Sequence, residues 1–220
     1  MIYSEEERKM IEILFEDADI LVCIKPAGYL SESSGESARS LPHALAAQQG
    51  VDELFTVHRL DREVSGVMVY AKSKAAAARL SAQVADRSFE KEYLAVIEGV
   101  PAEDEATLTD LLFKDSRKNK SFVVDRKRAG VKDASLSYKT LTKGDGCALV
   151  CIKLHTGRTH QIRVQFASRK MPVLGDGKYG SSVRSSEIAL ASCSIKFKHP
   201  RTNESLAFAY TPTGDMWEIR

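Results

Sequence analysis

The stretch ASLSYKTLTKGDGCALVCIKL, residues 134–154, contains two segments with strand character and a glycine-rich turn between them. Apolar and polar side chains alternate over residues 134–139, which is typical of a strand with one buried face. Gly144, Asp145 and Gly146 supply the residue types that tight hairpin turns require. The stretch therefore predicts an antiparallel β-hairpin.

Similar segments lie on both sides of this hairpin. Strand character recurs in two short segments within residues 13–28, and in residues 54–57, 67–70, 90–98, 106–113, 121–124, 189–197 and 205–210. Helical character is found in residues 42–49, 74–87 and 159–168, with Ser73 as the expected N-cap of the second helix. Many strands with few helices predict an α+β fold, with a mixed, mainly antiparallel β-sheet and a few flanking helices. The length of 220 residues suits one domain, residues 1–220.

Composition excludes several classes of protein. With 43% hydrophobic and 28% charged residues, the chain is neither disordered nor fibrous. No apolar run approaches the roughly 18 residues that a membrane span needs. The first ten residues, MIYSEEERKM, lack the basic start and apolar middle of a signal peptide. These features predict a cytoplasmic protein.

Charge is unevenly distributed along the chain, although the net charge is only +2. Residues 114–132 carry eight basic side chains against two aspartates, a local charge of +6, and this segment is called the basic segment below. Such a segment suits contact with a phosphate backbone. It is equally consistent with a solvated hairpin, and charge alone does not separate the two interpretations.

Four scattered cysteines favour reduced thiols over disulfides. Cys147, Cys151 and His155 share a spacing of four residues and would lie on one face of an extended strand, so a metal site is one interpretation. Structural zinc sites usually have four ligands with closely spaced cysteine pairs. We therefore favour buried, reduced cysteines.

Three polar segments punctuate the strands: HRLDREVSG (58–66), KEYLAVIEG (91–99) and LHTGRTHQIR (154–163). Further motifs are KPAG (25–28), Gly-Asp-x-x-Tyr-Gly (175–180) and HPRTNESLAF (199–208). In this order and spacing they resemble the RluA family of pseudouridine synthases. The resemblance implies the pseudouridine synthase fold with a central RNA-binding cleft, in a single-domain member without an N-terminal S4 domain.

This family isomerises uridine in RNA to pseudouridine by moving the uracil from an N-glycosidic bond to a bond through C5. The resemblance implies that Asp61 is the catalytic carboxylate, that Arg158 is its ion partner and that Tyr93 lies against the uracil. A carboxylate suits the reaction because it can add to the substrate and leave again. A nearby guanidinium keeps it ionised.

RNA-binding roles are expected for several other side chains. Arg59 is expected to fill the gap that an extruded uridine leaves, because a long planar cation can occupy such a space. The other candidate substrate-binding residues are Arg62, Lys91, Thr159, Gln161, Lys118, Lys120 and Lys127. His58 and His160 are expected to be structural, with His160 on the helix beside Arg158.

One position departs from the family pattern. The family commonly has threonine before Ser-Gly in the first motif, and this chain has Val64. The missing hydroxyl puts the rigidity of the Asp61 loop in doubt rather than the chemistry.

The implied partner is a stem-loop of ribosomal or transfer RNA, with no cofactor, no metal and no membrane, and the protein is expected to be a monomer without an obligate protein partner. A kinase is excluded because no glycine-rich phosphate loop or Asp-Phe-Gly motif accompanies the HRLD sequence. The remaining alternative is a catalytically silent protein that binds or folds RNA on the same scaffold.

Overall fold

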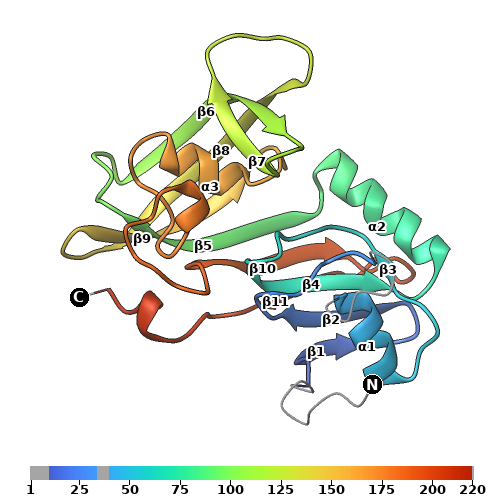
Figure 1. The fold of residues 1–220 in the computed structure, drawn as a ribbon. Helices are drawn as coiled ribbons and strands as arrows, with labels where there is room; N and C mark the ends of the chain where they lie inside the picture. Colours follow the sequence, from blue (N-terminus) through green and yellow to red (C-terminus); the bar gives the residue numbers. More distant parts are fainter. Residues whose placement is uncertain (1–9, 34–39, 220) are drawn as a thin grey trace. The chain divides into compact units, whose positions relative to one another are not determined.

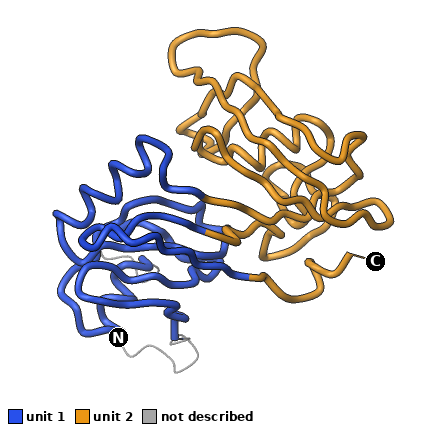
Figure 2. The backbone as a smooth tube through the Cα atoms, turned by 180° about the vertical axis from the view of Figure 1, so that it is seen from behind, with its two compact units in different colours: residues 1–90, 195–210 blue, residues 91–194, 211–220 orange. Residues whose placement is uncertain are grey.

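The computed structural model describes residues 10–33 and 40–219. The chain forms two compact units, shown in different colours in Figure 2. Unit 1 comprises residues 1–90 and 195–210, and unit 2 comprises residues 91–194 and 211–220. Residues 1–9 and 34–39 lie outside the described residues, and the former make up most of the stretch MIYSEEERKM.

Unit 1 is a sheet covered by helices (Figure 1). Strand β1 (Ile13–Glu16) pairs with β2 (Ile20–Lys25), and β2 pairs with β4 (Ser65–Ala71), both antiparallel. The short β3 (Phe55–Thr56) also pairs with β4. The end of β10 (Leu190–Lys198) and β11 (Ser205–Ala209) complete this part of the sheet. An isolated parallel bridge joins Leu30 and Ser40 outside these strands.

The core of unit 1 follows from a continuous apolar strand. Every residue of β2 is buried, and Ile20, Val22 and Ile24 pack in one cluster with side chains of β4 and of helix α2 (Lys74–Asp86). The Ser73 side chain caps α2 by accepting a hydrogen bond from the Ala76 N–H, as the sequence predicts. Helix α1 (Leu41–Gln49) ends at Gly50, whose φ of 66° suits a residue without a side chain.

Unit 2 contains the strands β5 (Glu90–Glu98), β6 (Glu105–Asp115), β7 (Lys120–Val124), β8 (Val131–Lys143) and β9 (Cys147–Leu154). They lie in the order β5-β9-β8-β6-β7, with every neighbouring pair antiparallel. Helix α3 (Gln161–Ala167) packs against β6 and β7. Two short 3₁₀ turns, η2 (Gly177–Tyr179) and η3 (Asp215–Trp217), were not predicted.

The predicted fold class is confirmed: a mixed, mainly antiparallel sheet with three α-helices in the part of the chain that the structure describes. The hairpin of residues 134–154 forms β8 and β9, with its turn at Gly144–Gly146. None of the helices in the described ranges is long and apolar enough to span a membrane.

Candidate functional site

Asp61 lies in a tight turn just before β4 in unit 1. The turn is closed by the N–H of Val64, which donates to the carbonyl of Asp61 at 3.1 Å. Asp61 is half-buried, and its neighbours Leu60 and Val64 are buried. The sequence explains this arrangement, because two apolar side chains anchor the turn while the charged residues between them stay near its surface.

Hydrogen bonds of Ser31 and Gly28 fix this loop to the segment after β2. Ser31 holds Leu60 from both sides, since its hydroxyl donates to the Leu60 carbonyl and accepts from the Leu60 N–H. The Gly28 N–H donates to the carbonyl of Arg62 at 2.8 Å. Gly28 has a φ of 89°, a conformation that favours glycine. This explains the glycine of the KPAG motif.

Lys25 is the most unusual group near the loop. Its side chain is fully buried, and its Nζ donates to the carbonyl oxygens of Pro26, Arg62 and Val64 at 3.0, 3.1 and 2.7 Å. Burial lowers the pKa of Lys25 to about 8, while the Asp61 carboxylate acts in the opposite direction. The ammonium thus clamps the backbone on the C-terminal side of Asp61.

The Lys25 clamp was missed as a functional feature of the sequence. The available signal was a lysine that ends the apolar run ILVCI and precedes Pro26. The clamp also bears on Val64, because its N–H donates to the Asp61 carbonyl within the loop and its own carbonyl accepts from Lys25 on β2. The backbone of the loop is therefore held without a threonine hydroxyl at this position.

His58 has the structural role expected from the sequence. It is buried, its Nε2 accepts a hydrogen bond from the Val69 N–H at 3.2 Å, and its ring lies 5.2 Å from that of Phe89. Arg59 and Arg62 are exposed. Arg59 pairs with Glu32 at 3.1 Å, and the Nε of Arg62 donates to the Gly28 carbonyl.

Tyr93 lies on β5 in unit 2, opposite Ile152 on β9, and is 6% exposed. Lys91, two residues earlier on the strand, is half-buried, and burial lowers the pKa of its ammonium. Asp61 belongs to unit 1, whereas Tyr93 and Arg158 belong to unit 2.

Arg158 lies in the loop between β9 and α3. Its Nε donates to the carbonyl of Asp133 on β8 at 2.9 Å. Gln161 is buried, and its Oε1 accepts from the Arg158 N–H and the Thr156 hydroxyl, while its Nε2 donates to the Ser135 carbonyl. The Gln161 amide thus ties the Arg158 loop to β8. Thr159 is half-buried, and its carbonyl accepts from the Ser121 hydroxyl.

The expected position of His160 on the helix is wrong in detail. His160 is the N-cap of α3, with a left-handed φ of 53°, and Arg158 precedes the helix. The physical reason lies in the packing of its side chain. The ring is buried, and its Nδ1 is hydrogen-bonded to the Tyr179 hydroxyl at 2.9 Å.

The basic segment forms the β6–β7 hairpin and the turn into β8 (Figure 1). Lys118 and Lys127 are exposed, and Lys127 pairs with Asp133 at 3.0 Å. Lys120 is half-buried and donates to the Lys178 carbonyl. Seven of its eight basic residues are exposed, so most of its charge faces solvent.

The expected cysteine pattern holds only in part. All four thiols are free, but Cys23 alone is buried, and Cys147, Cys151 and Cys193 are half-buried. His155 is bonded to the Ser137 hydroxyl, and among the described residues it forms no metal-ligating group with Cys147 and Cys151.

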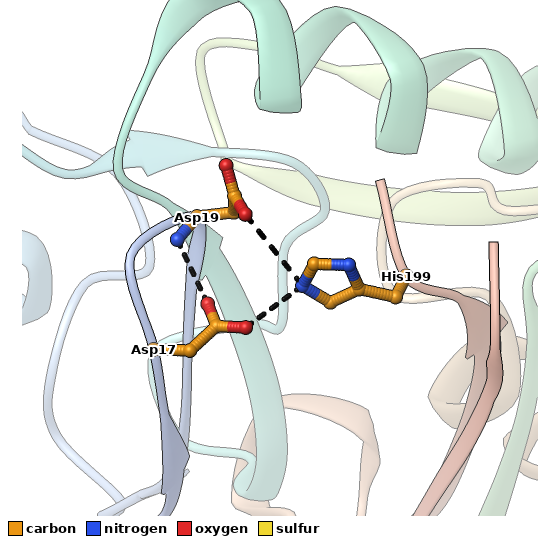
Figure 3. A group of neighbouring side chains, drawn as sticks. All are labelled: Asp17, Asp19 and His199. Atoms are coloured by element: carbon orange, nitrogen blue, oxygen red, sulfur yellow. Dashed lines mark hydrogen bonds and ion pairs between the residues drawn. The ribbon is translucent and has the colours of Figure 1, made fainter. Parts of the chain in front are cut away.

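A different group of potential metal ligands occurs in unit 1, formed by Asp17, Asp19 and His199 (Figure 3). The Nδ1 of His199 accepts from the N–H groups of Arg201 and Thr202, so its Nε2 carries the proton and donates to Asp17 at 2.9 Å. A metal ion bound to Nε2 would force the proton onto Nδ1, which could then no longer accept from the N–H groups of Arg201 and Thr202. The group therefore suits a structural connection between two turns better than a metal site.

A shallow pocket of about 500 Å³ in unit 1 is lined by residues 50–53, Phe55 and residues 72–74. It contains none of the predicted catalytic residues.

Comparison with known proteins identifies the family. A family model described as RNA pseudouridylate synthase matches residues 19–168. An uncharacterized RNA pseudouridine synthase of Aquifex aeolicus is 36% identical, over 90% of this chain and 68% of the relative. The ribosomal large subunit pseudouridine synthase D of Zymomonas mobilis is 31% identical, over 97% of this chain and 73% of the relative.

A solved structure shows the same fold. Human RNA Pseudouridylate Synthase Domain Containing 1 superposes with a TM-score of 0.78 at 24% identity, covering 96% of this chain and 86% of the human one. The resemblance drawn from the sequence motifs is thus confirmed. The chain belongs to the RNA pseudouridylate synthase family, whose members are isomerases that act on RNA.

Proposed function

We propose that Asp61 supplies the carboxylate with which this pseudouridine synthase adds to and releases its uridine. The observation that supports this role most directly is the clamp on the Asp61 loop. Lys25 bonds the carbonyls of Arg62 and Val64, and Ser31 holds Leu60, so the backbone is fixed on both sides of the carboxylate. A fixed nucleophile reacts faster, because little orientational freedom remains to be lost in the transition state.

Tyr93 and Arg158 are the partners that the family resemblance suggests for Asp61. In this proposal Arg158 is the ion partner of the carboxylate, and the Tyr93 ring supports the uracil and helps in the loss of the C5 proton. Gln161 acts as a positioning residue for Arg158, since its amide bonds the Arg158 N–H and β8. Lys91 and Thr159 lie next to these groups in sequence and complete the substrate-binding set.

The substrate proposed here is a stem-loop of ribosomal or transfer RNA. One relative is named a ribosomal large subunit pseudouridine synthase, which supports the ribosomal class. Arg59 is exposed and takes the space of the extruded uridine, while Arg62 and the basic segment contact phosphates. Exposed lysines such as Lys118 and Lys127 set the position of the RNA without reading its sequence.

The two units act together as one catalytic domain, because residues of both are needed for the reaction proposed here. The protein acts as a monomer in the cytoplasm. Free thiols support this location, since reduced cysteines persist in a reducing compartment.

The test uses a strain that lacks the gene, complemented with wild type or with Asp61→Asn. We expect wild type to restore pseudouridine at one or more ribosomal or transfer RNA positions, and Asp61→Asn to restore none. The matched control is Asp52→Asn, which changes an exposed aspartate of the same unit. Pseudouridine that persists with Asp61→Asn at wild-type levels would overturn the assignment.

The alternative is a protein that binds RNA without modifying it. It predicts that Asp61→Asn and wild type give the same RNA modification and the same growth. Unchanged RNA affinity with complete loss of pseudouridine excludes this alternative, because binding alone needs no carboxylate among cations.

A further inference from the structure

The outer face of the β6–β7 hairpin carries an aromatic pair. Phe113 on β6 lies directly opposite Phe122 on β7, so both side chains project from the same face of the hairpin. Their neighbours Leu112 and Val123 point the other way, into a buried cluster with Ala134. The two rings therefore lie on the face of the hairpin that is turned away from this core.

Both rings are accompanied by cations. The guanidinium of Arg128 lies 5.0 Å from the centroid of the Phe113 ring, and the ammonium of Lys120 lies 5.7 Å from that of Phe122. Phe122 is 36% exposed, unusually high for a phenylalanine, and Arg128 is also exposed. The face thus presents an aromatic ring and a ring-supported guanidinium plane, two flat groups on which nucleobases stack.

The surrounding charge favours a polyanion over a protein or a membrane. Phe122 lies within the basic segment, whose local charge is +6, and Phe113 directly precedes it; the exposed cations of the segment are suited to phosphates. Proteins bind single-stranded nucleic acids with aromatic rings that lie between phosphate-binding cations. The bases stack on the rings, and the phosphate backbone follows the positive charge. A duplex hides its base faces and offers only phosphates to such a surface.

We propose that Phe122 and the Arg128 side chain on Phe113 form a stacking platform for unpaired nucleotides of the RNA substrate. This inference rests on the proposed function, and it adds that the basic segment selects unpaired nucleotides of the RNA. The platform lies wholly within unit 2 and consists of residues other than those assigned to the chemistry. Its contribution is to affinity for single-stranded RNA rather than to the chemical step.

The test measures binding of the purified full-length protein to two fluorescein-labelled probes, a 12-nucleotide oligoadenylate and a 12-base-pair RNA duplex. Phe122→Ala is expected to weaken binding of the single strand by about tenfold, an effect within the range of one base stacked on an aromatic ring. Binding of the duplex should change by less than about twofold, because no base face is available there. Phe122→Trp should retain the single-strand affinity.

Salt dependence separates stacking from charge. Phe122→Ala should leave the slope of log affinity against log salt unchanged, whereas Lys118→Ala should reduce it by about 0.7 on the single strand. The matched control is Leu141→Ala, which removes an exposed apolar side chain from β8 in the same unit and should leave both affinities unchanged.

The platform would be overturned by equal losses of affinity for both probes or by no loss for either. It would also be overturned if Phe122→Trp bound the single strand as weakly as Phe122→Ala. Wild type is assayed for pseudouridine formation in parallel on ribosomal and transfer RNA from a strain that lacks the gene. If wild type is active but Phe122→Ala binds oligoadenylate normally, the platform fails and the proposed function stands. If Phe122→Ala loses the single strand selectively but wild type is inactive, the proposed function fails and the platform stands.

Discussion

Replacing Lys25 by methionine removes the ammonium that clamps the Asp61 loop and keeps much of the side-chain volume. Three hydrogen bonds from a charged donor are lost, and at about 1.5 to 3 kcal/mol each they contribute on the order of 5 to 9 kcal/mol. Holding the charge in a buried site costs about 3 kcal/mol, the equivalent of lowering its pKa from 10.5 to about 8. The free energy of unfolding should therefore fall by about 2 to 6 kcal/mol.

The change should affect catalysis more than RNA binding. The carbonyls of Arg62 and Val64 lose their donor, so the turn that carries Asp61 can shift by about 1 Å, a displacement that costs on the order of a hundredfold in rate. We expect kcat to fall by about this factor, with the Kd for RNA within about threefold of wild type.

The assay is single-turnover pseudouridine formation at 15 °C with saturating enzyme, after circular dichroism has shown that the variant is folded. Lys72→Met is the matched control, because Lys72 is a partly buried lysine of unit 1 that pairs with Glu16 away from the loop. A folded Lys25→Met enzyme with wild-type kcat, or one whose defect lies wholly in RNA affinity, would refute the positioning role.

Further predictions follow from the same geometry. Because the folded pKa of Lys25 is lowered, the unfolded chain binds more protons than the folded chain between pH 8 and 10.5. The free energy of unfolding of wild type, relative to that of Lys25→Met, should therefore rise by up to about 3 kcal/mol across that window. Urea titrations that show a fall would contradict this. Arg59→Ala should lower turnover on a folded stem-loop more than on an unpaired target, and equal turnover by wild type and variant on both RNAs would remove the role of Arg59. Reversing the charge of Lys118, Lys120 and Lys127 should flatten the salt dependence of RNA binding, whereas an unaltered slope would show that the basic segment does not contact phosphates. Gln161→Ala should lower kcat while leaving the salt slope unchanged, because its amide orders the Arg158 loop from within unit 2; a normal kcat would contradict this.

Much of the fold could be predicted from local sequence patterns. The period-two alternation of residues 134–139 and the turn residues 144–146 indicated β8 and β9, and Ser73 marked the start of α2. These features depend on neighbours in sequence, so they are readable without a structure. The left-handed backbone of His160 could not be predicted in this way, because its ring is hydrogen-bonded to the Tyr179 hydroxyl, 19 residues further along the chain.

The candidate site was predicted unevenly for the same reason. The motifs pointed to Asp61, Tyr93 and Arg158 through family resemblance, and these roles stay predictions. The groups that hold them were not predicted, because Lys25 reaches Val64 across 39 residues and Gln161 reaches Ser135 across 26. Such contacts depend on how distant segments pack, and no spacing within a motif encodes them. The same holds for the Phe113–Phe122 pair, which exists only in the register of β6 with β7.

Release of the proton from C5 of uridine tests the role of Asp61 most directly. RNA from a strain that lacks the gene is labelled with tritium at C5 of its uridines, and the tritium released into water is counted in a single turnover. The carboxylate mechanism predicts one tritium per modified site with wild type and none above background with Asp61→Asn, although both bind the RNA equally. Release by Asp61→Asn at a rate near that of wild type would show that the isomerisation does not depend on this carboxylate.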